Sequence, residues 1–239
     1  MNGINLLGIT PLRTEKTSQS ELCTQLLFGE SYQVFEQEGE WLRIKNQSDG
    51  YEGWLNQTQF YSQKEEFERL RICNFPYFLD EDFGYLPTGS FFLKRGNLPK
   101  NLLVKPDKPF SDFAMQFLNA PYLWGGKSFM GIDCSGFVQV VYSCFGVDLP
   151  RDAKQQALHG ETVDFAVEAK ECDLAYFANK EGRITHVGIC LGNGKIIHAS
   201  GKVRIDELDS FGIFNAEIGK HTHELKLIKR LAPFKTNPD

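Results

Sequence analysis

The chain has 239 residues, of which 41% are hydrophobic and 24% are charged, and its net charge is −5 from 26 basic and 31 acidic residues. This length supports one large domain or two smaller ones, and this composition is that of an ordinary globular protein. The basic residues are scattered along the chain, which excludes the footprint of a nucleic-acid-binding protein and disfavours a polyanionic ligand.

The N-terminus and the cysteines bear on the compartment. Met1 to Pro11 lacks the basic and apolar segments of a signal peptide, and no later stretch approaches the length of a membrane span. The six cysteines are widely spaced without a C-x-x-C pair, which favours reduced thiols over a disulfide framework. If Met1 is the natural start, we expect a cytoplasmic protein with no membrane partner, although a trimmed signal segment would leave the same sequence.

Residues 1–61 are predicted to form short strands separated by turns. Ser31–Glu36 and Trp41–Lys45 alternate in polarity, and a glycine-containing turn joins them as a hairpin. Asp49-Gly50 is expected to end the second strand in a turn before a third strand over Tyr51–Leu55. Strands this short and this close together indicate a small β-barrel.

Residues 62–109 are predicted to be a structured connector. Its charged beginning favours a short helix from Ser62 toward Leu70, and residues 84–92 look like a hairpin. Prolines at 99, 106 and 109 make the end of this segment a suitable domain boundary.

The next segment places a cysteine at the start of a helix. From Cys134 onward, apolar residues recur at helical spacing and end before Gly146, a plausible C-terminal cap. The free N–H groups and the helix dipole of a first turn stabilise a thiolate, which is the nucleophilic form of cysteine. A single cysteine is more often a buried packing residue, so a catalytic role for Cys134 requires a base nearby.

The rest of residues 110–235 has helices first and strands afterwards. Ser111 is a suitable N-cap for a helix through Asn119, and a short helix is expected after Asp152. Strands are predicted over residues 173–178, 184–191, 195–199 and 225–231. This order implies an α+β domain with a mainly antiparallel sheet.

Two histidines fall on the predicted strands around Asn193. In a hairpin whose loop is centred on Asn193, Gly188 faces His198. His186 is then the diagonal neighbour of His198 on the same face of the hairpin, with the two Cα atoms roughly 7–8 Å apart. A two-residue loop would instead place the two histidines on opposite faces. A cysteine nucleophile needs a base and usually a third group that orients it. Cys134, His186 and His198 are therefore a candidate catalytic set, with ordinary packing as the open alternative.

Cysteine and histidine are also zinc ligands. A zinc site needs three or four ligands and is favoured by local pairs such as C-x₂-C or H-x₃-H, which do not occur here. We therefore expect no metal and no cofactor. His159, His221 and His223 lie after a helix end or in a polar stretch and are not expected to be catalytic.

Five blocks of sequence resemble the NlpC family of papain-like cysteine peptidases, which act on bacterial cell-wall peptides. These blocks, found in the family's order and spacing between residues 110 and 234, are Trp124-Gly125-Gly126, Asp133-Cys134-Ser135-Gly136, Pro150-Arg151-Asp152-Ala153, Thr185-His186-Val187-Gly188-Ile189 and Ile197-His198-Ala199-Ser200-Gly201. Residues 27–30, 39–44 and 50–55 resemble a bacterial SH3-like domain, a combination typical of γ-D-glutamyl-L-diamino-acid endopeptidases. The resemblance implies a papain-like α+β catalytic domain over residues 110–235, preceded by an SH3-like β-barrel over residues 1–61.

The resemblance also implies roles for individual residues. Cys134 would be the nucleophile, His186 its base and His198 the residue that orients His186. Further residues would line the substrate groove: Tyr51, Asp133, Ser135, Arg151 and Asp152. In such two-domain relatives the aromatic residue matched by Tyr51 belongs to a wall that admits only peptides with a free N-terminal L-Ala. Relatives usually have Gly where this chain has Cys172, a departure in a turn outside the site.

The implied substrates are peptidoglycan-derived peptides of the type L-Ala-γ-D-Glu-diamino acid, cleaved after D-Glu without a cofactor. One alternative is a general cell-wall hydrolase or amidase on the same scaffold. Another is a non-catalytic cell-wall-binding module. The residues leave open which diamino acid is accepted and what the oligomeric state is.

Overall fold

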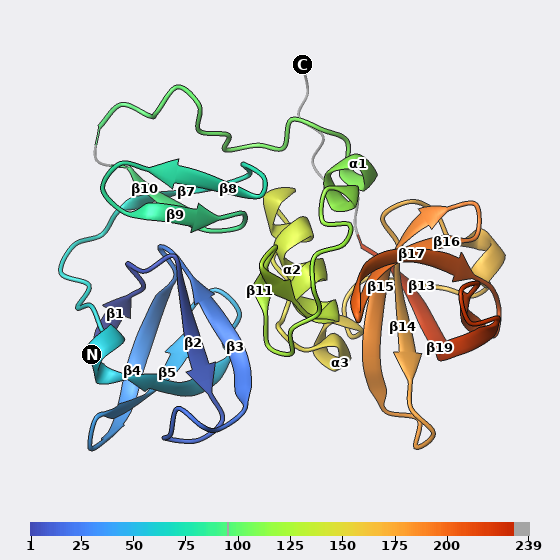
Figure 1. Cartoon of the computed structure of the whole chain (residues 1–239), viewed down its shortest axis with the longest axis horizontal. Helices are drawn as coiled ribbons and strands as arrows, with labels where there is room; N and C mark the ends of the chain where they lie inside the picture. Colours follow the sequence, from blue (N-terminus) through green and yellow to red (C-terminus); the bar gives the residue numbers. More distant parts are fainter. Residues whose placement is uncertain (95, 232–239) are drawn as a thin grey trace.

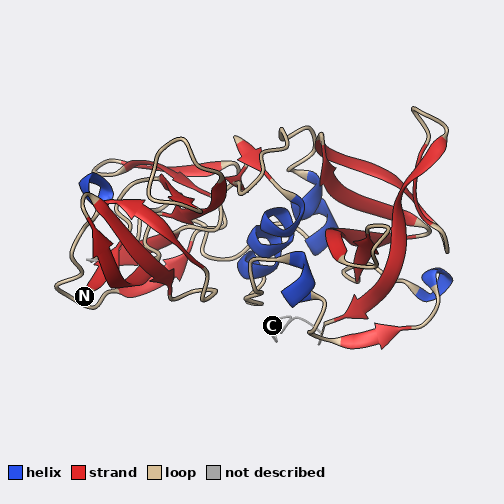
Figure 2. Ribbon diagram, turned by 90° about the horizontal axis from the view of Figure 1, so that it is seen from below, coloured by secondary structure: helices blue, strands red, loops and turns tan. Residues whose placement is uncertain are grey.

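The α-helices lie in the middle of the molecule, between two β-rich parts (Figures 1 and 2). The structure is a computed structural model that describes residues 1–94 and 96–231. The helices are η1 (Gln57–Gln59), α1 (Phe110–Met115), α2 (Cys134–Cys144), α3 (Ala153–Gln156) and η2 (Ala166–Glu168). The strands are β1 (Asn2–Ile4), β2 (Ile9–Arg13), β3 (Leu22–Leu27), β4 (Ser31–Glu38), β5 (Trp41–Asn46), β6 (Glu52–Asn56), β7 (Glu68–Arg71), β8 (Tyr77–Asp80), β9 (Gly84–Pro87), β10 (Phe91–Lys94), β11 (Lys127–Ser128), β12 (Gly131–Ile132), β13 (Glu161–Val163), β14 (Leu174–Ala178), β15 (Ile184–Gly192), β16 (Lys195–Ser200), β17 (Lys202–Leu208), β18 (Gly212–Asn215) and β19 (Lys220–Arg230).

The N-terminal part is the small β-barrel that the sequence predicts. Its six strands pair in the order β1-β4-β5-β6-β2-β3, and the three strands expected between residues 31 and 55 appear as β4, β5 and β6. Alternate residues of these strands point inward because successive side chains in a strand face opposite ways. The interior is apolar, and its fully buried residues include Leu12, Leu26, Tyr32, Ile44 and Leu55.

The connector packs against this barrel, and two expectations for it are wrong. The expected helix is absent: Glu68–Arg71 forms strand β7, which pairs with β10. Residues 84–92 are not one hairpin either, because β9 pairs with β8 while β10 pairs with β7. Pairing with partners distant in sequence overrides local helix propensity here. Ile72, Phe78 and Leu86 of the connector share a core with Ile4 and Phe28 of the barrel.

The helices that follow agree with the sequence only in part. Helix α2 begins at Cys134 and ends with Phe145 as its C-cap, just before Gly146, as predicted. Helix α1 is shorter than expected, and its N-cap is Pro109 rather than Ser111. Ser111 instead lies within α1, where its hydroxyl is buried with no hydrogen-bond partner among the described residues.

The C-terminal sheet is antiparallel and closes on itself. Seven strands pair in the order β13-β19-β14-β15-β16-β17-β18, and β18 pairs back onto β19. One face packs on α2, where Val187, Ile189 and Ile197 join Phe137 and Val141 in the main core. Strands β13, β17 and β18 have no counterpart among the predictions, and the strand predicted from residue 225 begins at Lys220. The predicted end of this domain, residue 235, lies outside the described residues.

The β15–β16 hairpin brings the two predicted histidines to one face by an unexpected turn. Gly192 pairs with Lys195, so the loop is Asn193-Gly194 and the expected loop centred on Asn193 is wrong. A bulge between Cys190 and Gly192 adds one residue to β15, which restores the pairing of Gly188 with His198. A Cβ at Gly188 would lie 2.9 Å from the Cβ of His198, so this position needs glycine.

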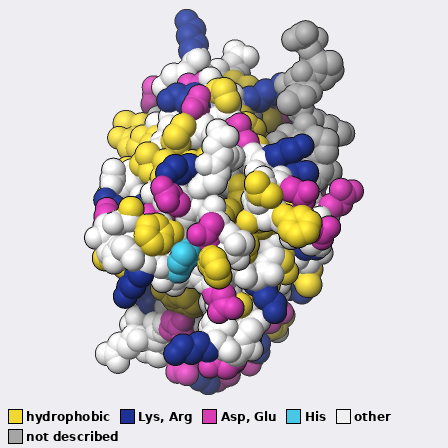
Figure 3. Space-filling model, turned by 90° about the vertical axis from the view of Figure 1, so that its right-hand side faces the viewer, with side chains coloured by type: hydrophobic (Ala, Val, Ile, Leu, Met, Phe, Trp, Pro, Cys, Tyr) yellow, Lys and Arg dark blue, Asp and Glu magenta, His cyan; other side chains and the backbone are white. Residues whose placement is uncertain are grey.

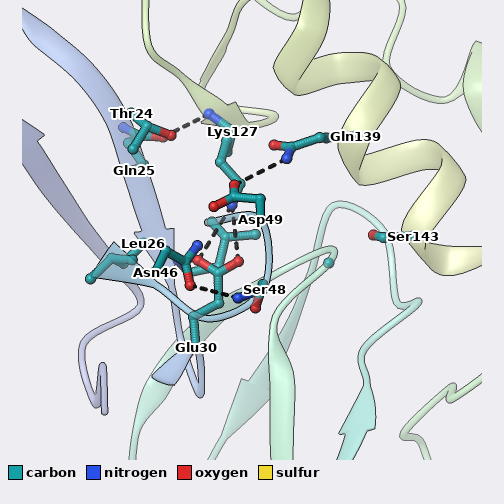
Figure 4. Close-up of polar contacts among 12 residues, drawn as sticks. Thr24, Gln25, Leu26, Glu30, Asn46, Ser48, Asp49, Lys127, Gln139 and Ser143 are labelled. Carbon is teal, nitrogen blue, oxygen red and sulfur yellow. Dashed lines mark hydrogen bonds and ion pairs between the residues drawn. The ribbon is translucent and has the colours of Figure 1, made fainter. Parts of the chain in front are cut away.

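A buried polar interface joins the barrel to the catalytic part. Lys127 Nζ lies 3.0 Å from Glu30 Oε1, and the two side chains are only 5% and 3% exposed. The Lys127 backbone N–H donates to Gln25 Oε1 at 2.8 Å, and Gln139 Nε2 of α2 donates to Asp49 Oδ2 at 3.1 Å. Figure 4 shows Lys127 extending toward Glu30 beside the contact between Gln139 and Asp49. These contacts fix the barrel on the α2 side of the catalytic part.

The surface and the helices add two general observations. At the end of the molecule formed by the C-terminal sheet, acidic and basic side chains are intermixed without a broad area of one sign (Figure 3). Within residues 1–94 and 96–231, no helix is long and apolar enough to cross a membrane.

The interface predicts unequal effects of two similar substitutions. Glu30→Gln leaves the Lys127 ammonium buried without its counter-charge, and we expect a loss of about 3–5 kcal/mol in unfolding free energy. Urea denaturation followed by circular dichroism measures this loss.

Glu68→Gln is the matched control, because the pair between Glu68 and Lys94 is 60% and 37% exposed. Its removal should cost less than about 1 kcal/mol. Equally small losses in both variants would show that water screens the Glu30–Lys127 pair and would contradict a dry interface.

Candidate active site

Asp133 organises the start of the helix that carries Cys134. Its Oδ1 accepts the N–H of Gly136 at 2.7 Å, which makes it the side-chain N-cap of α2. Its Oδ2 accepts the N–H of Gly125 at 2.8 Å. One carboxylate therefore ties the glycine-rich loop to the first turn of the helix and holds Cys134 between them.

Arg151 lies against this carboxylate in a buried ion pair. Its guanidinium donates to both oxygens of Asp133, and Nη1 also donates to Ser135 Oγ at 2.8 Å. Its Nε donates to Thr24 Oγ1 of the barrel at 2.8 Å. Because Arg151 is only 2% exposed, its fixed donors mainly hold Asp133, Ser135 and the barrel together.

Close backbone contacts explain two glycines of the sequence blocks. A Cβ at Gly136 would lie 2.3 Å from the carbonyl oxygen of Gly126, and a Cβ at Gly126 would lie 2.3 Å from that of Gly131. These distances are far below van der Waals contact, so any larger residue would push α2 away from the loop.

The Cys134 thiol is buried and uncharged in the resting protein. Cys134 is 6% exposed. Burial, followed by the charge of Asp133, raises the pKa of the thiol to about 11, against lowering by the N–H groups of Val187 and Ser135. The helix start is therefore not the largest influence on the pKa of this thiol, because desolvation outweighs it.

His186, His198 and Asp206 form a chain of hydrogen bonds. His186 Nε2 lies 2.9 Å from His198 Nδ1, and His198 Nε2 lies 3.0 Å from Asp206 Oδ2. Burial by itself would raise the pKa of Asp206, but hydrogen bonds from His198 and Arg204 outweigh it and lower this pKa. Asp206 is thus a carboxylate that accepts the His198 Nε2 proton.

This chain fixes the tautomer of both imidazoles. A single proton on His198 Nε2 leaves a lone pair at Nδ1, and His186 then donates to it from Nε2. The lone pair of His186 then lies on Nδ1, the nitrogen left for Cys134. Burial, and then the neighbours His223 and His198, hold the pKa of His186 well below its usual range, so this base is neutral.

Sequence reasoning missed Asp206 and its partner Arg204. Arg204 donates to both oxygens of Asp206, from Nε at 2.7 Å and from Nη2 at 2.9 Å. Both residues belong to β17, which pairs with β16 so that Arg204 faces His198. The alternation of Val203, Asp206 and Leu208 with polar neighbours was the available signal, but it is irregular and does not identify the partner strand.

His223 was also missed as a neighbour of the site. Its ring stacks on that of His186, with centroids 4.1 Å apart and planes at 26°. Burial lowers the pKa of His223 to about 4. It comes from β19, which starts before the strand expected from residue 225. One ring nitrogen each of His186, His198 and His223 lies within 4.8 Å of the other two. Among the described residues, these three side chains form a group that could hold a metal ion.

A groove of about 450 Å³ opens onto Cys134 and is lined by both parts of the molecule. The barrel contributes Thr14, Glu21, Cys23 and Tyr51, and the catalytic part contributes Trp124, Asp133, Cys134, Ser135, Arg151, Asp152, Ala153, Lys154, Ile184 and Thr185. All five residues expected to bind substrate therefore border the groove that contains Cys134.

These five residues differ in how accessible they are. Asp133, Ser135 and Arg151 are 5%, 7% and 2% exposed, and they form the floor. Tyr51 and Asp152 form a more open wall. Burial, followed by the nearby Asp152 carboxylate, raises the pKa of the Tyr51 hydroxyl to about 12, so this hydroxyl stays protonated beside the carboxylate.

Comparisons with known proteins agree with this geometry. Residues 119–218 match the NlpC/P60 family, and residues 12–60 match the bacterial dipeptidyl-peptidase SH3 domain. The chain is 31% identical over 213 residues to the gamma-D-glutamyl-L-lysine dipeptidyl-peptidase of Bacillus subtilis (strain 168), which covers 74% of this chain and 71% of that protein. A protein of the same name from Bacillus cereus is 26% identical over 229 residues, 77% of this chain and 68% of that protein.

Solved structures show the same fold. An NlpC/P60 family protein from Bacillus cereus has a TM-score of 0.75 at 20% identity and covers 98% of this chain and 100% of its own. The NlpC/P60 endopeptidase of Photobacterium damselae has a TM-score of 0.64 at 17% identity, over 95% of this chain and 70% of its own. Together with the family match and the relative at 31% identity, the cysteine at the helix start leads to one conclusion: this chain is a member of the NlpC/P60 family of cysteine peptidases, with a bacterial SH3 domain in front of its catalytic domain.

Proposed function

We propose that this cell-wall peptidase cleaves the bond between γ-linked D-Glu and the following diamino acid in peptides that begin with a free L-Ala. The observation that carries the proposal is the single groove in which Cys134 and residues of the SH3 domain share one lining. A groove bounded by a second domain accepts a short peptide end more readily than the middle of a polymer. The names of the Bacillus relatives support the same γ-D-glutamyl bond.

The SH3 side of the groove suits an ammonium group. Glu21 of the SH3 domain and Asp152 of the catalytic domain both line it, and the Tyr51 hydroxyl lies beside Asp152. Carboxylates and a hydroxyl are the groups that bind an α-amine through charge-assisted hydrogen bonds. In the intact wall this L-Ala nitrogen is an amide, so a free amine marks a released fragment. We therefore assign the enzyme to the turnover or recycling of peptidoglycan peptides.

The proposed chemistry is acyl transfer through a thioester. His186 Nδ1 takes the Cys134 proton as the sulfur attacks the γ-carbonyl carbon of D-Glu, and the resulting imidazolium protonates the leaving amine. Water then hydrolyses the thioester, with His186 again acting as base. Asp206 keeps the His198 proton on Nε2, so His198 can accept from His186 and stabilise its positive charge.

The developing oxyanion needs a donor at the start of α2. We assign this role to the backbone N–H of Cys134, because Asp133 already satisfies the N–H of Gly136. Removing one such donor costs other enzymes about 2.7–4 kcal/mol of transition-state stabilisation. Since both Cys134 and His186 are neutral at rest, the site separates charge only when the substrate is in place.

The first prediction concerns the nucleophile. Cys134→Ser should abolish hydrolysis of L-Ala-γ-D-Glu-diaminopimelate with the fold intact, because a serine hydroxyl is a far weaker nucleophile toward this carbonyl. Mass spectrometry of the products follows L-Ala-γ-D-Glu and the free diamino acid.

Cys172→Ser is the matched control, since Cys172 is half-buried in a turn away from the groove. It should keep its turnover. Near-native turnover by Cys134→Ser would show that the nucleophile is assigned wrongly, and products cut at another bond would favour an amidase or a general wall hydrolase.

The second prediction concerns the amine. Acetylation of L-Ala removes its charge, and a hydrogen bond to a charged group contributes about 1.5–3 kcal/mol, so kcat/KM should fall by about 10- to 100-fold. The control is the same peptide amidated at its C-terminal carboxylate, which should lose less. Equal rates for the acetylated and free peptides would remove the assignment to released fragments.

The third prediction follows from the raised pKa of the Cys134 thiol, about 11. Because only the thiolate is alkylated, iodoacetamide labelling of Cys134 should keep rising with pH from about 7 to about 10. Peptide mapping measures the labelling, and Cys134→Ser reports the background from the other thiols. A plateau already reached at neutral pH would instead show a resting thiolate–imidazolium pair.

A further inference from the structure

Three histidines from three separate strands meet on the C-terminal sheet. His186 belongs to β15, His198 to β16 and His223 to β19, and one ring nitrogen of each lies within 4.8 Å of the others. The hydrogen-bond chain uses His186 and His198 but gives His223 no task. Local spacing in the sequence could not indicate this cluster, because the closed sheet assembles it.

We propose that His186, His198 and His223 form a zinc-binding site through which Zn²⁺ inhibits the peptidase. Three imidazole nitrogens with a fourth position left for water are an established ligand set for zinc. The three imidazoles are buried or half-buried in the described structure, so these ligands lose few contacts with water when they bind an ion.

Neighbouring side chains already orient two of the three ligands. The Asp206 carboxylate holds His198 Nε2 at 3.0 Å and thereby leaves the lone pair of Nδ1 toward His186. The Thr222 hydroxyl lies 2.9 Å from His223 Nδ1, which leaves Nε2 of that ring as the ligand. A carboxylate behind a metal-bound histidine is the arrangement that raises zinc affinity in other proteins.

Ion binding requires only local movement. His186 Nε2 and His198 Nδ1 are 2.9 Å apart, and a zinc ion at about 2.0–2.1 Å from each nitrogen needs them slightly further apart. The His223 ring has to turn out of its stack on His186 so that Nε2 points at the ion. The His223 side chain is only half-buried, so such a turn meets less packing than it would in the core.

Zinc at this position would stop the reaction by moving one proton. In the resting chain His186 carries its proton on Nε2 and its lone pair on Nδ1. Ligation needs the Nε2 lone pair, so the same proton must sit on Nδ1 of the neutral ring. Nδ1 then no longer accepts a proton from Cys134, and no proton is released overall. This inhibitory effect depends on the proposed function, whereas the binding of zinc does not.

Isothermal titration calorimetry of the chelator-treated full chain with ZnCl₂ tests the binding. The main alternative is a zinc ion held by the Cys134 thiolate and His186, so Cys134→Ala distinguishes the two modes. We expect one zinc ion per chain in the unaltered protein and in Cys134→Ala, and loss of binding in His223→Phe, whose ring can keep the stack on His186.

Two further variants sharpen the test. His221→Phe is the matched control, because His221 lies on the same strand but is exposed and bonded to Asp209 at 2.9 Å, and it should bind zinc like the unaltered chain. Asp206→Asn should weaken zinc binding by about 10- to 100-fold. Peptide hydrolysis should be inhibited by Zn²⁺ and restored by EDTA, with His223→Phe resistant relative to its own uninhibited rate.

Zinc binding that survives His223→Phe, or that disappears in Cys134→Ala, overturns the site. Absence of binding in the unaltered chain overturns it as well. A failed peptidase assay with intact three-histidine binding would count against the proposed function and leave the zinc site standing, because calorimetry does not depend on turnover.

Discussion

The buried ion pair between Asp133 and Arg151 is the contact on which the rest of the site depends. Asp133 caps α2 and holds the glycine loop, while Arg151 fixes Asp133 and reaches Thr24 of the SH3 domain. Such a pair adds little net stability because desolvation offsets its attraction, but loss of one partner leaves a buried charge. Its effect is geometric: the nucleophile, the loop before it and the neighbouring domain are positioned by one set of hydrogen bonds.

The same burial that gives this precision sets the charge state of the site. Desolvation and the charge of Asp133 raise the pKa of the Cys134 thiol to about 11. Desolvation and the neighbouring His223 and His198 lower the pKa of His186, so both groups favour their neutral forms. The helix dipole is a weaker influence than removal from water. Asp206 supplies a fixed negative charge on the base side and, through His198, decides which nitrogen of His186 is free. Activation then has to come from substrate binding, which also excludes remaining water from the groove.

Local pattern and family resemblance predicted much of this molecule, and some of the misses share a physical cause. The helix at Cys134, the barrel strands between residues 31 and 55, and the pair His186 and His198 all have signals within a few residues of themselves. Strand β7 is defined by β10, which lies further along the chain, so its local sequence gave a helix. Strand β17 follows its partner β16 through a tight turn at Gly201 and was missed although that partner is adjacent in sequence. Asp206 joined the site through that adjacent hairpin, whereas His223 joined it through the long-range pairing of β19 with β14 and of β14 with β15. For the β15–β16 hairpin the predicted turn was wrong but the predicted pairing of Gly188 with His198 was right, because a bulge compensated for the shorter loop.

Coupling between the domains follows from where the interface lies. Lys127, which bonds Glu30 and Gln25 of the SH3 domain, stands between the glycine loop and the nucleophile in sequence. Gln139 of α2 bonds Asp49, only two residues before Tyr51. The chain segments that position Cys134 are therefore the segments that hold the SH3 wall, and the depth of the groove between Tyr51 and Cys134 is fixed by buried contacts rather than by a flexible linker. Under the proposed function, a peptide longer at its amino end would have to break those contacts to enter, and the domain interface would itself contribute to the enzyme's selectivity.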